Sequence, residues 1–171
     1  KLYKPQIVKE VFSNTGRILH KNKPELVSEI HLKPNVLKLI KQGLWEAVNT
    51  SKGTAWWQRG QGIDMAGKTG TSQVISFSAD QLFSKCEKKP YKHRHHGVFA
   101  SFLPAEDPKI AIGVVVEHGC HGNTAAAPVA RDIAQVYMKK YFPDQYEFYL
   151  ERDRKIYREY IKGIKLSKTE S

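Results

Sequence analysis

Short apolar runs alternate with turn-forming residues over the first third of the chain. An apolar run at 7–12 is followed by Asn14-Thr15-Gly16 and then by a second run at 17–20. Two such runs around a turn that contains Asn and Gly predict a β-hairpin. Residues 27–32 form one more β-like run before the pattern changes.

We expect a helix to begin at Pro34, because proline is favoured in the first turn of a helix. Apolar residues then recur three to four positions apart, which predicts a helix to about Thr50 with one buried stripe. Ser51-Lys52-Gly53 ends this helix. The predicted stripe consists of Val36, Leu37, Ile40, Leu44 and Val48.

The second half of the chain predicts an α+β fold. We expect a strand over 63–75, a polar and basic loop over 76–96, a β-hairpin over 97–117 and a helix over 124–142. Antiparallel strands beside segregated helices define the α+β class. Residues 114–116 are all valine, so we expect them in a central strand covered on both faces. The predicted core stripe of the last helix consists of Val129, Ile133, Val136 and Tyr137.

Residues 144–171 differ from the rest, because aromatic and aliphatic side chains alternate there with dense charge of both signs. This pattern is typical of an amphipathic helix that packs on its own domain. Docking of a partner protein is the alternative. We therefore divide the chain into a domain over 1–143 and a charged amphipathic tail over 144–171.

The distribution of charge along the chain limits the functions that the sequence could have. The formal net charge is +11, and the excess lies in residues 1–43, which carry +6, and in residues 85–96, which carry +4. Strong basicity makes a nucleic-acid-binding module the main rival interpretation. Such modules usually interleave aromatic residues with their cations or place them on one recognition helix, and neither segment does so. Attraction to an anionic membrane surface or to an anionic wall polymer explains the positive net charge equally well.

Two cysteines, Cys86 and Cys120, are too few for a disulfide framework. They could pair in an oxidising compartment, but the sequence does not show that they are close together. Residues 93–96 and 118–121 contain zinc-ligand types without paired finger spacing. We favour the interpretation that all of these are ordinary loop residues, with no metal.

The segment Ala66-Gly67-Lys68-Thr69-Gly70-Thr71-Ser72 carries the most specific chemistry. Lysine supplies a compact positive charge, threonine hydroxyls donate hydrogen bonds, and glycine lets another molecule approach the backbone. The combination suits a strand whose edge binds an extended anionic ligand. A phosphate-binding loop also contains Gly-Lys-Thr, but a helix must follow its lysine, and here β-forming residues follow.

Lys-Thr-Gly is the third of three motifs in serine acyl-transferases that act on penicillin. Over roughly residues 1–142, the order of motifs resembles class B penicillin-binding proteins of the elongation type, the penicillin-binding protein 2 group. Residues 66–74 are the specific part of the resemblance. It implies part of the penicillin-binding and serine β-lactamase-like transpeptidase fold, an antiparallel sheet flanked by helices. The supporting segments are 3–8, 53–55, 96–102, 109–112 and 126–130.

The resemblance implies roles for the residues of the motif strand. Lys68 would place positive charge beside the serine motifs and the ligand carboxylate. The hydroxyls of Thr69 and Thr71 would hydrogen-bond that carboxylate, and the backbone N–H of Thr71 would be one oxyanion donor. Gly70 leaves room for the ligand backbone, and Ser72 completes the substrate-binding set. Strict alternation puts Lys68 and Gly70 on the face opposite the threonines, so the groups converge only along the strand edge or through strand twist.

The family's nucleophile motif, Ser-x-x-Lys, and its second motif, Ser-x-Asn, do not occur in the sequence. We therefore expect the C-terminal portion of a longer D,D-transpeptidase, with the serine upstream and this chain inactive alone. No run is long enough to span a membrane, and no signal peptide is visible. We expect a periplasmic domain anchored in the bacterial inner membrane by a segment outside this chain.

The implied ligands are a peptidoglycan stem peptide and the β-lactams that mimic it. By the same resemblance, the implied protein partners are the glycan polymerase of the elongation complex and an MreC-type scaffold. We expect no cofactor and no nucleic acid. A non-catalytic scaffold domain of the same fold and a serine β-lactamase are rival hypotheses, together with the nucleic-acid-binding module.

Overall fold

The computed structural model describes residues 1–76 and 84–169, so residues 77–83 of the predicted loop and the last two residues of the tail lie outside the described residues. The chain divides into two compact units, Lys1–Lys38 and Leu39–Ser171. Each unit is described by itself.

The first unit is a narrow antiparallel ribbon. β2 (Glu10–Phe12) pairs with β3 (Ile18–Lys21) around the predicted turn, where Gly16 adopts a φ of 82° that suits glycine. β1 (Leu2–Tyr3) pairs with β4 (Leu26–Ser28). A two-stranded ribbon has no second layer, so its apolar side chains gain little burial within the unit. Those that remain exposed include Ile7, Val11, Phe12, Ile18, Leu19 and Val27.

Helix α1 (Pro34–Asn49) forms where the spacing predicted it, but only its last turns are buried. Val48 is 1% exposed and lies in the core of the second unit, and Leu44 is half-buried. The other three members of the predicted stripe are exposed by 39–48%. Periodicity identified the helix and its apolar face, but it does not show how far along the helix a core extends.

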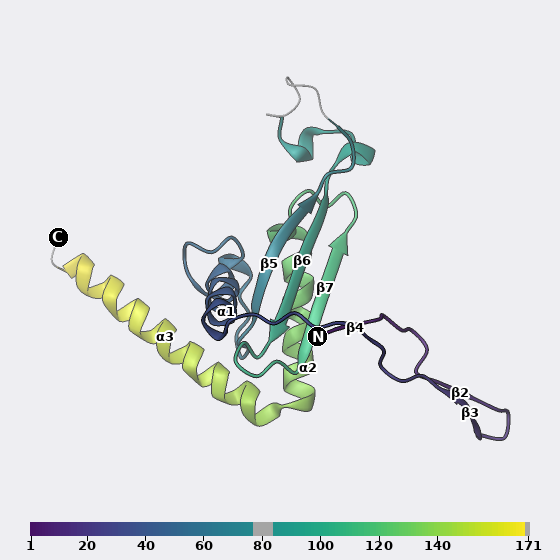
Figure 1. Ribbon diagram of the computed structural model, residues 1–171. Helices are drawn as coiled ribbons and strands as arrows, with labels where there is room; N and C mark the ends of the chain where they lie inside the picture. Colours follow the sequence, from purple (N-terminus) through teal and green to yellow (C-terminus); the bar gives the residue numbers. More distant parts are fainter. Residues whose placement is uncertain (77–83, 170–171) are drawn as a thin grey trace. The chain divides into compact units, whose positions relative to one another are not determined.

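The second unit is built on a three-stranded antiparallel sheet. β5 (Ala66–Ser72), β6 (His96–Leu103) and β7 (Ile110–Val116) lie side by side in that order (Figure 1). All seven residues of β5 have a partner in β6, with Lys68 opposite Ala100. β5 is therefore an outer strand with one unpaired edge among the described parts of the chain.

The expectation that residues 114–116 lie in a central strand covered on both faces is wrong for this structure. β6 is the central strand and β7 is an outer one. Val114 and Val116 pack against the core, whereas Val115 points away from it and is 64% exposed. The strand period of two places successive valines on opposite faces, and only one of these faces meets the core.

Helix α2 (Ala127–Tyr141) covers that face of the sheet and is preceded by a π-helical turn, η4 (Gly122–Ala126). The predicted core stripe is wrong in three of four positions, because Val129, Ile133 and Val136 are exposed by 43–67%. Tyr137 alone packs against the core. Small side chains let a helix approach a sheet closely, so side-chain size decides which face is buried. The fully buried residues are Ala127, Ala130, Ala134 and Met138.

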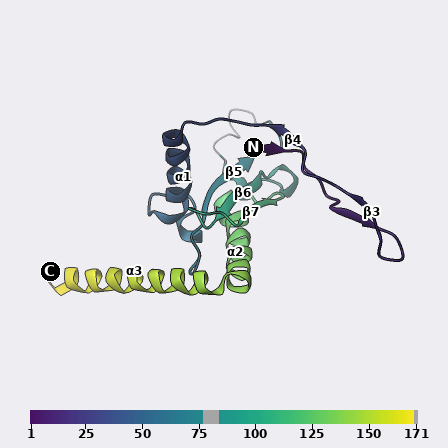
Figure 2. The same ribbon diagram turned by 60° about the horizontal axis from the view of Figure 1, so that its bottom comes forward.

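Helix α3 (Pro143–Thr169) leaves the end of α2 in a new direction (Figure 2). Its first turns pack against the rest of the second unit, where Tyr146 and Tyr149 border the core. A methyl group at Gly62 would lie 2.5 Å from the Tyr146 ring, which shows how closely this part of the tail packs in cis. No described helix combines the length and apolarity needed to cross a bilayer. The remaining helical turns are η1 (Trp56–Gln58), η2 (Cys86–Lys88) and η3 (Tyr91–His93).

The buried face of α2 gives a direct test of the packing. Replacing Ala130→Leu adds methylene groups where no space is available, so we expect it to lower the free energy of unfolding by about 1–3 kcal/mol. The matched change Val136→Leu on the exposed face should stay within about 0.5 kcal/mol of the parent chain. Urea denaturation of the two variants measures the difference. A larger loss for the Val136 variant would contradict the assignment of the faces.

Candidate functional site: the free edge of strand β5

The predicted site residues lie together on the outer edge of β5. Lys68, Thr71 and Ser72 are exposed, and Thr69 and Gly70 are half-buried. The pairing with β6 runs from Ala66 to Ser72 without a register shift, so side chains alternate regularly along the strand. Lysine and threonine side chains therefore lie on opposite faces and can converge only at the unpaired edge.

The Lys68 side chain bends around its own strand. Its Nζ donates a hydrogen bond to the Thr69 carbonyl oxygen at 3.0 Å, which holds the ammonium beside the backbone of the strand. The Thr69 hydroxyl lies 3.1 Å from the hydroxyl of Thr54, in the turn after α1. Thr54 thus orients the Thr69 hydroxyl, a contact that sequence reasoning missed because the two threonines are 15 positions apart.

Glycines have two different functions around this strand. A methyl group at Gly122 would lie only 2.1 Å from the Val98 carbonyl oxygen and 2.6 Å from that of Gly70, so η4 can approach β5 and β6 only with glycine there. A methyl group at Gly70 itself would lie 3.5 Å from the Val98 side chain, an ordinary contact. The packing of the described residues therefore does not require glycine at position 70.

The structure excludes a phosphate-binding loop in this segment. Gly62 and Gly67 stand at the spacing of Gly-x-x-x-x-Gly-Lys-Thr, so spacing alone agrees with that motif. Such a loop needs its Lys-Thr to open a helix. Lys68 and Thr69 instead lie in the middle of a regular strand.

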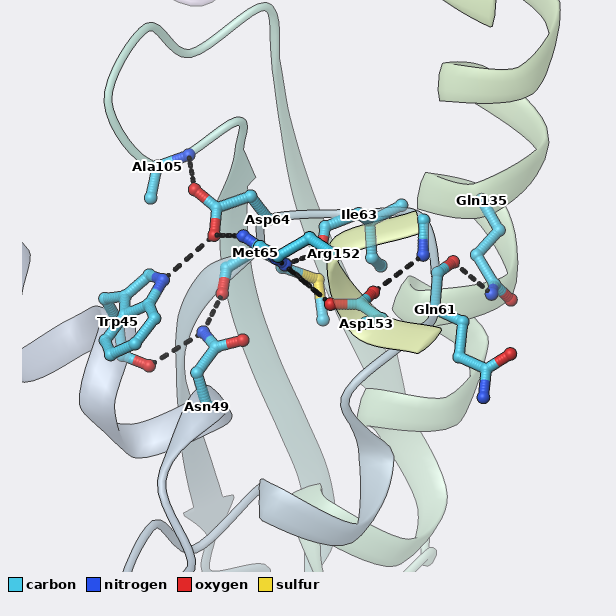
Figure 3. A network of polar contacts seen from close by, with 11 residues as sticks. Trp45, Asn49, Gln61, Ile63, Asp64, Met65, Ala105, Gln135, Arg152 and Asp153 are labelled. Atoms are coloured by element: carbon cyan, nitrogen blue, oxygen red, sulfur yellow. Dashed lines mark hydrogen bonds and ion pairs between the residues drawn. The ribbon is translucent and has the colours of Figure 1, made fainter. Parts of the chain in front are cut away.

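A buried carboxylate holds the segment that leads into β5. Asp64 is 7% exposed and accepts hydrogen bonds from Trp45 Nε1 at 3.0 Å and from Arg152 Nη1 at 3.1 Å (Figure 3). The backbone N–H of Ala105, after β6, donates to the other carboxylate oxygen at 3.4 Å. One side chain thus joins α1, the β6–β7 connection and α3 two residues before the strand begins.

Two further contacts hold the same lead-in by its backbone. Asn49 Nδ2 on α1 donates to the Met65 carbonyl oxygen at 2.8 Å. The Asp153 carboxylate on α3 accepts from the Gly62 N–H at 3.0 Å. Backbone groups that are paired in this way cannot shift without losing hydrogen bonds, so the position of β5 is set from both helices.

Arg152 is the cation of this network. Burial by itself would lower the pKa of the guanidinium, but the charge of Asp153 and hydrogen bonds to Asp153 and Asp64 raise the pKa above its ordinary value. Burial together with the Asp64 charge raises the pKa of the neighbouring Tyr149 phenol. Arg152 therefore remains charged and Tyr149 neutral. Asp64 and Arg152 are 88 positions apart, so their pairing left no local signal in the sequence.

The cysteines form a disulfide, Cys86–Cys120, which corrects the interpretation that they are ordinary loop residues. Both are buried, and the Cys120 N–H also donates to the His95 carbonyl oxygen at 2.9 Å. The loop before β6 is thereby joined to the turn after β7. A bonded cystine offers no thiolate to a metal ion, and the described residues contain no group of three His, Cys, Asp or Glu placed to hold one.

Comparison with known proteins identifies a family match over most of the chain. The model of the penicillin binding protein transpeptidase domain matches residues 1–135. The peptidoglycan D,D-transpeptidase MrdA of Haemophilus influenzae is 31% identical over 107 residues, 60% of this chain and 16% of that protein. Penicillin-binding protein 2A of Bacillus subtilis is 27% identical over 145 residues, 81% of this chain and 19% of that protein. The chain thus spans less than a fifth of the length of these relatives.

Solved structures show the same fold. In the complex between penicillin-binding protein PBP2 and MreC from Helicobacter pylori, the matching chain is 28% identical with a TM-score of 0.56, over 75% of this chain and 22% of that one. Pseudomonas aeruginosa PBP2 in complex with WCK 5153 is 27% identical with a TM-score of 0.54, over 72% of this chain and 24% of that one.

A double-mutant cycle tests the contact between α3 and the lead-in to β5. Arg152→Met leaves the Asp64 carboxylate without its cation, so we expect a loss of about 3 kcal/mol in the free energy of unfolding. The matched change Arg154→Met, on the exposed side of the same helix, should cost no more than about 0.5 kcal/mol.

Combining Arg152→Met with Asp64→Asn should cost clearly less than the sum of the single changes, because the buried charge is then absent. Urea denaturation gives all three values. Additive losses would show that the two side chains do not act on one another.

Proposed function

Since this chain belongs to the penicillin-binding protein transpeptidase family, as its motif order predicted, we propose that it is the C-terminal portion of a peptidoglycan D,D-transpeptidase of the elongation type. Its α+β fold is that of the family's transpeptidase domains, again as predicted. Its relatives are more than five times as long as the matched part, and the chain contains no Ser-x-x-Lys motif. Both facts support a nucleophilic serine on a part of the protein upstream of this chain.

The unpaired edge of β5 is the observation that carries this proposal. An extended peptide can add to such an edge as a further strand, with main-chain hydrogen bonds supplying affinity. The ligand would be the end of a wall stem peptide, which carries a terminal carboxylate. Lys68 would attract that carboxylate, and the hydroxyls of Thr69 and Thr71 would donate hydrogen bonds to it. Bonds to a charged group are the stronger kind. Gly70, where packing requires no glycine, leaves room for the ligand backbone.

The proposed chemistry is acyl transfer in two steps. The upstream serine oxygen bonds to the carbonyl carbon of the penultimate D-alanine, and the terminal D-alanine leaves with the proton from the serine. The amine of a second stem peptide then bonds to the same carbon, and the serine recovers a proton. Alternate N–H groups of an edge strand point outward, and we assign that of Thr71 to the oxyanion. One preorganised donor of this kind can lower the barrier by about 3–4 kcal/mol.

Ligands, partners and location follow from the same assignment. β-Lactams would react as mimics of the donor peptide and leave the serine acylated. An MreC-type scaffold is supported by the Helicobacter pylori relative, whose structure is a complex with MreC. We extend the proposal to the glycan polymerase of the elongation complex. The domain would act in the periplasm and be anchored in the inner membrane by a segment outside this chain, where it would contribute to cell shape.

Labelling with a fluorescent penicillin tests the location of the nucleophile. We expect covalent labelling of the full-length protein and none of the 171-residue chain, because the serine is not part of it. Gel fluorescence and mass spectrometry of the adduct give the result. An acylated residue within this chain would refute the proposal.

Lys68→Ala tests the electrostatic part of the site. In the full-length protein, we expect acylation by penicillin to slow by about 100-fold, because the ligand carboxylate loses its nearest cation. Lys139→Ala, which removes an exposed lysine of α2, should leave the rate within about twofold. Stopped-flow or gel-based acylation rates provide the comparison. Equal rates for the parent and the Lys68 variant would remove Lys68 from the site.

Thr71→Val removes one hydroxyl and keeps both the backbone N–H and the side-chain shape. A hydrogen bond to a charged group contributes about 1.5–3 kcal/mol, so we expect acylation to slow by about 10- to 100-fold. Replacing Thr50→Val, at the end of α1, provides a control, since the Thr50 hydroxyl donates to the Glu46 carbonyl oxygen of its own helix. The same acylation assay distinguishes the two, and an unaffected Thr71 variant would assign carboxylate binding to other groups.

A further inference from the structure

We propose that an aromatic pocket in the second unit binds a neutral saccharide, and that its ligand is a glycan segment of N-acetylated sugars. The pocket has a volume of about 480 Å³, within the range of about 300–1,000 Å³ that is usual for ligand sites. All the tryptophans of the chain, Trp45, Trp56 and Trp57, line it. The acyl transfer proposed above uses none of them.

Trp57 offers a large apolar surface to a ligand. It lies in η1 and is 85% exposed, whereas Trp45 and Trp56 are half-buried. A side chain as exposed as this contributes little to the core, so packing does not account for a tryptophan here. An indole has a wide apolar face. A sugar ring can stack its C–H groups on such a face while the hydroxyl groups at the ring edge stay free for hydrogen bonds.

Polar groups beside the tryptophans are available to such a ligand. The Arg59 guanidinium stacks on the Trp56 ring, 3.4 Å from its centroid, and forms no hydrogen bond with the described residues. Asn49 Nδ2 donates to two backbone carbonyl oxygens, whereas Asn49 Oδ1 accepts no hydrogen bond within the described ranges. The Gln61 side chain extends away from the polar network, and its amide has no partner in the described parts of the chain (Figure 3). The pocket thus presents both donors and acceptors.

The charge of the pocket favours a neutral ligand. Arg152 pairs with Asp153 at 3.0 Å and with Asp64 at 3.1 Å. These two carboxylates offset the charges of Arg152 and Arg59, and no lysine is among the described residues that line the pocket. Single-stranded nucleic acids also stack their bases on tryptophan, but their binding sites combine the aromatic side chains with a positively charged groove. The balanced charge therefore disfavours a polyanion.

An apolar side chain of a protein partner fits the same lining less well. It would cover the Arg59 guanidinium and the Gln61 amide without offering them a hydrogen bond, and a buried polar group without a partner costs binding free energy. Hydroxyl groups are donors and acceptors at once, and an acetamido group adds an amide N–H and a carbonyl oxygen. An N-acetylated sugar can therefore pair with Arg59, Asn49 and Gln61 while its ring covers Trp57.

The pocket is built on the segment that leads into β5. Gly60 and Gln61 line it, and Asn49 Nδ2 donates to the carbonyl oxygen of Met65, the residue before the strand. If the proposed function holds, a glycan in the pocket would be held beside the strand that takes its stem peptide. The choice of N-acetylated sugars rests on that function, because the glycan of peptidoglycan is built of them. The preference for a neutral saccharide rests on the lining alone.

Calorimetric titration of the full-length protein with chitotetraose, a linear oligomer of N-acetylglucosamine, tests the site. We expect saturable binding, and Trp57→Ala should weaken it by about tenfold or more because the stacking surface is lost. Tyr141→Ala removes an exposed aromatic side chain of α2 outside the pocket and should change binding by no more than about twofold. Absence of saturable binding, or equal losses in the two variants, would overturn the proposal.

A second pair of measurements tests the polar groups and the class of sugar. Arg59→Met keeps an apolar chain beside Trp56 but removes the guanidinium N–H groups, so binding should weaken by about fivefold. Arg154→Met, at an exposed arginine of α3 outside this pocket, serves as the control. Maltotetraose, a glucose oligomer of the same length without acetamido groups, should bind at least about fivefold more weakly than chitotetraose. Equal binding of the two oligosaccharides would overturn the choice of N-acetylated sugars.

Penicillin acylation separates this proposal from the transpeptidase assignment. Trp57→Ala should leave the acylation rate of the full-length protein within about twofold, because penicillin carries no glycan and an exposed side chain is not needed for folding. Normal acylation without chitotetraose binding would overturn the saccharide site alone. Binding that depends on Trp57 in a protein that penicillin does not acylate would overturn the transpeptidase assignment and leave the saccharide site standing.

Discussion

The burial of the Asp64 carboxylate constrains the rest of the second unit. Taking an ionised group out of water costs several kcal/mol unless charge and hydrogen bonds replace the lost hydration. The replacements come from an indole N–H on α1, a backbone N–H after β6 and a guanidinium on α3. These groups are distant in sequence and meet at one carboxylate. All three hydrogen bonds to Asp64 therefore form only when the segments that carry the donors are correctly placed around it.

This constraint matters most for β5, because Asp64 stands two residues before it. An unpaired strand edge is usually a liability, since any extended segment can add to it. Here the unpaired edge of β5 is short and carries Lys68. On its other side, β5 is paired along its whole length with β6. Under the proposed function, this edge would be the template for one kind of extended ligand. It would contribute position and charge, and the proposal assigns the bond-forming serine to another part of the protein.

Local pattern in the sequence was sufficient for some parts of this structure and not for others. It identified the helix beginning at Pro34, the strand around Lys68 and the hairpin that follows, because each has a period or a motif of its own. It misassigned the buried face of α2, because hydropathy ranks Val129 and Ile133 above Ala130, whereas a close helix–sheet contact selects small side chains. It could not find the Cys86–Cys120 bond or the Asp64–Arg152 pair, since contacts across 34 and 88 residues leave no local trace.

Two different kinds of interaction, a charge network and a disulfide, hold segments at the opposite ends of β5. A buried charge network holds the start of β5, and a disulfide joins the loop and the turn that pack at its far end. Between them, β5 pairs with a strand on one side only within the described ranges, which leaves its outer edge unpaired. A catalytic donor is effective when it need not reorganise during the reaction, so holding both ends of the strand would favour the oxyanion role proposed for Thr71. The family match ends at residue 135, yet Arg152 lies beyond it. The C-terminal helix therefore helps to position this edge, and the matched residues alone would lack the contacts that Arg152 and Asp153 make with the segment before β5.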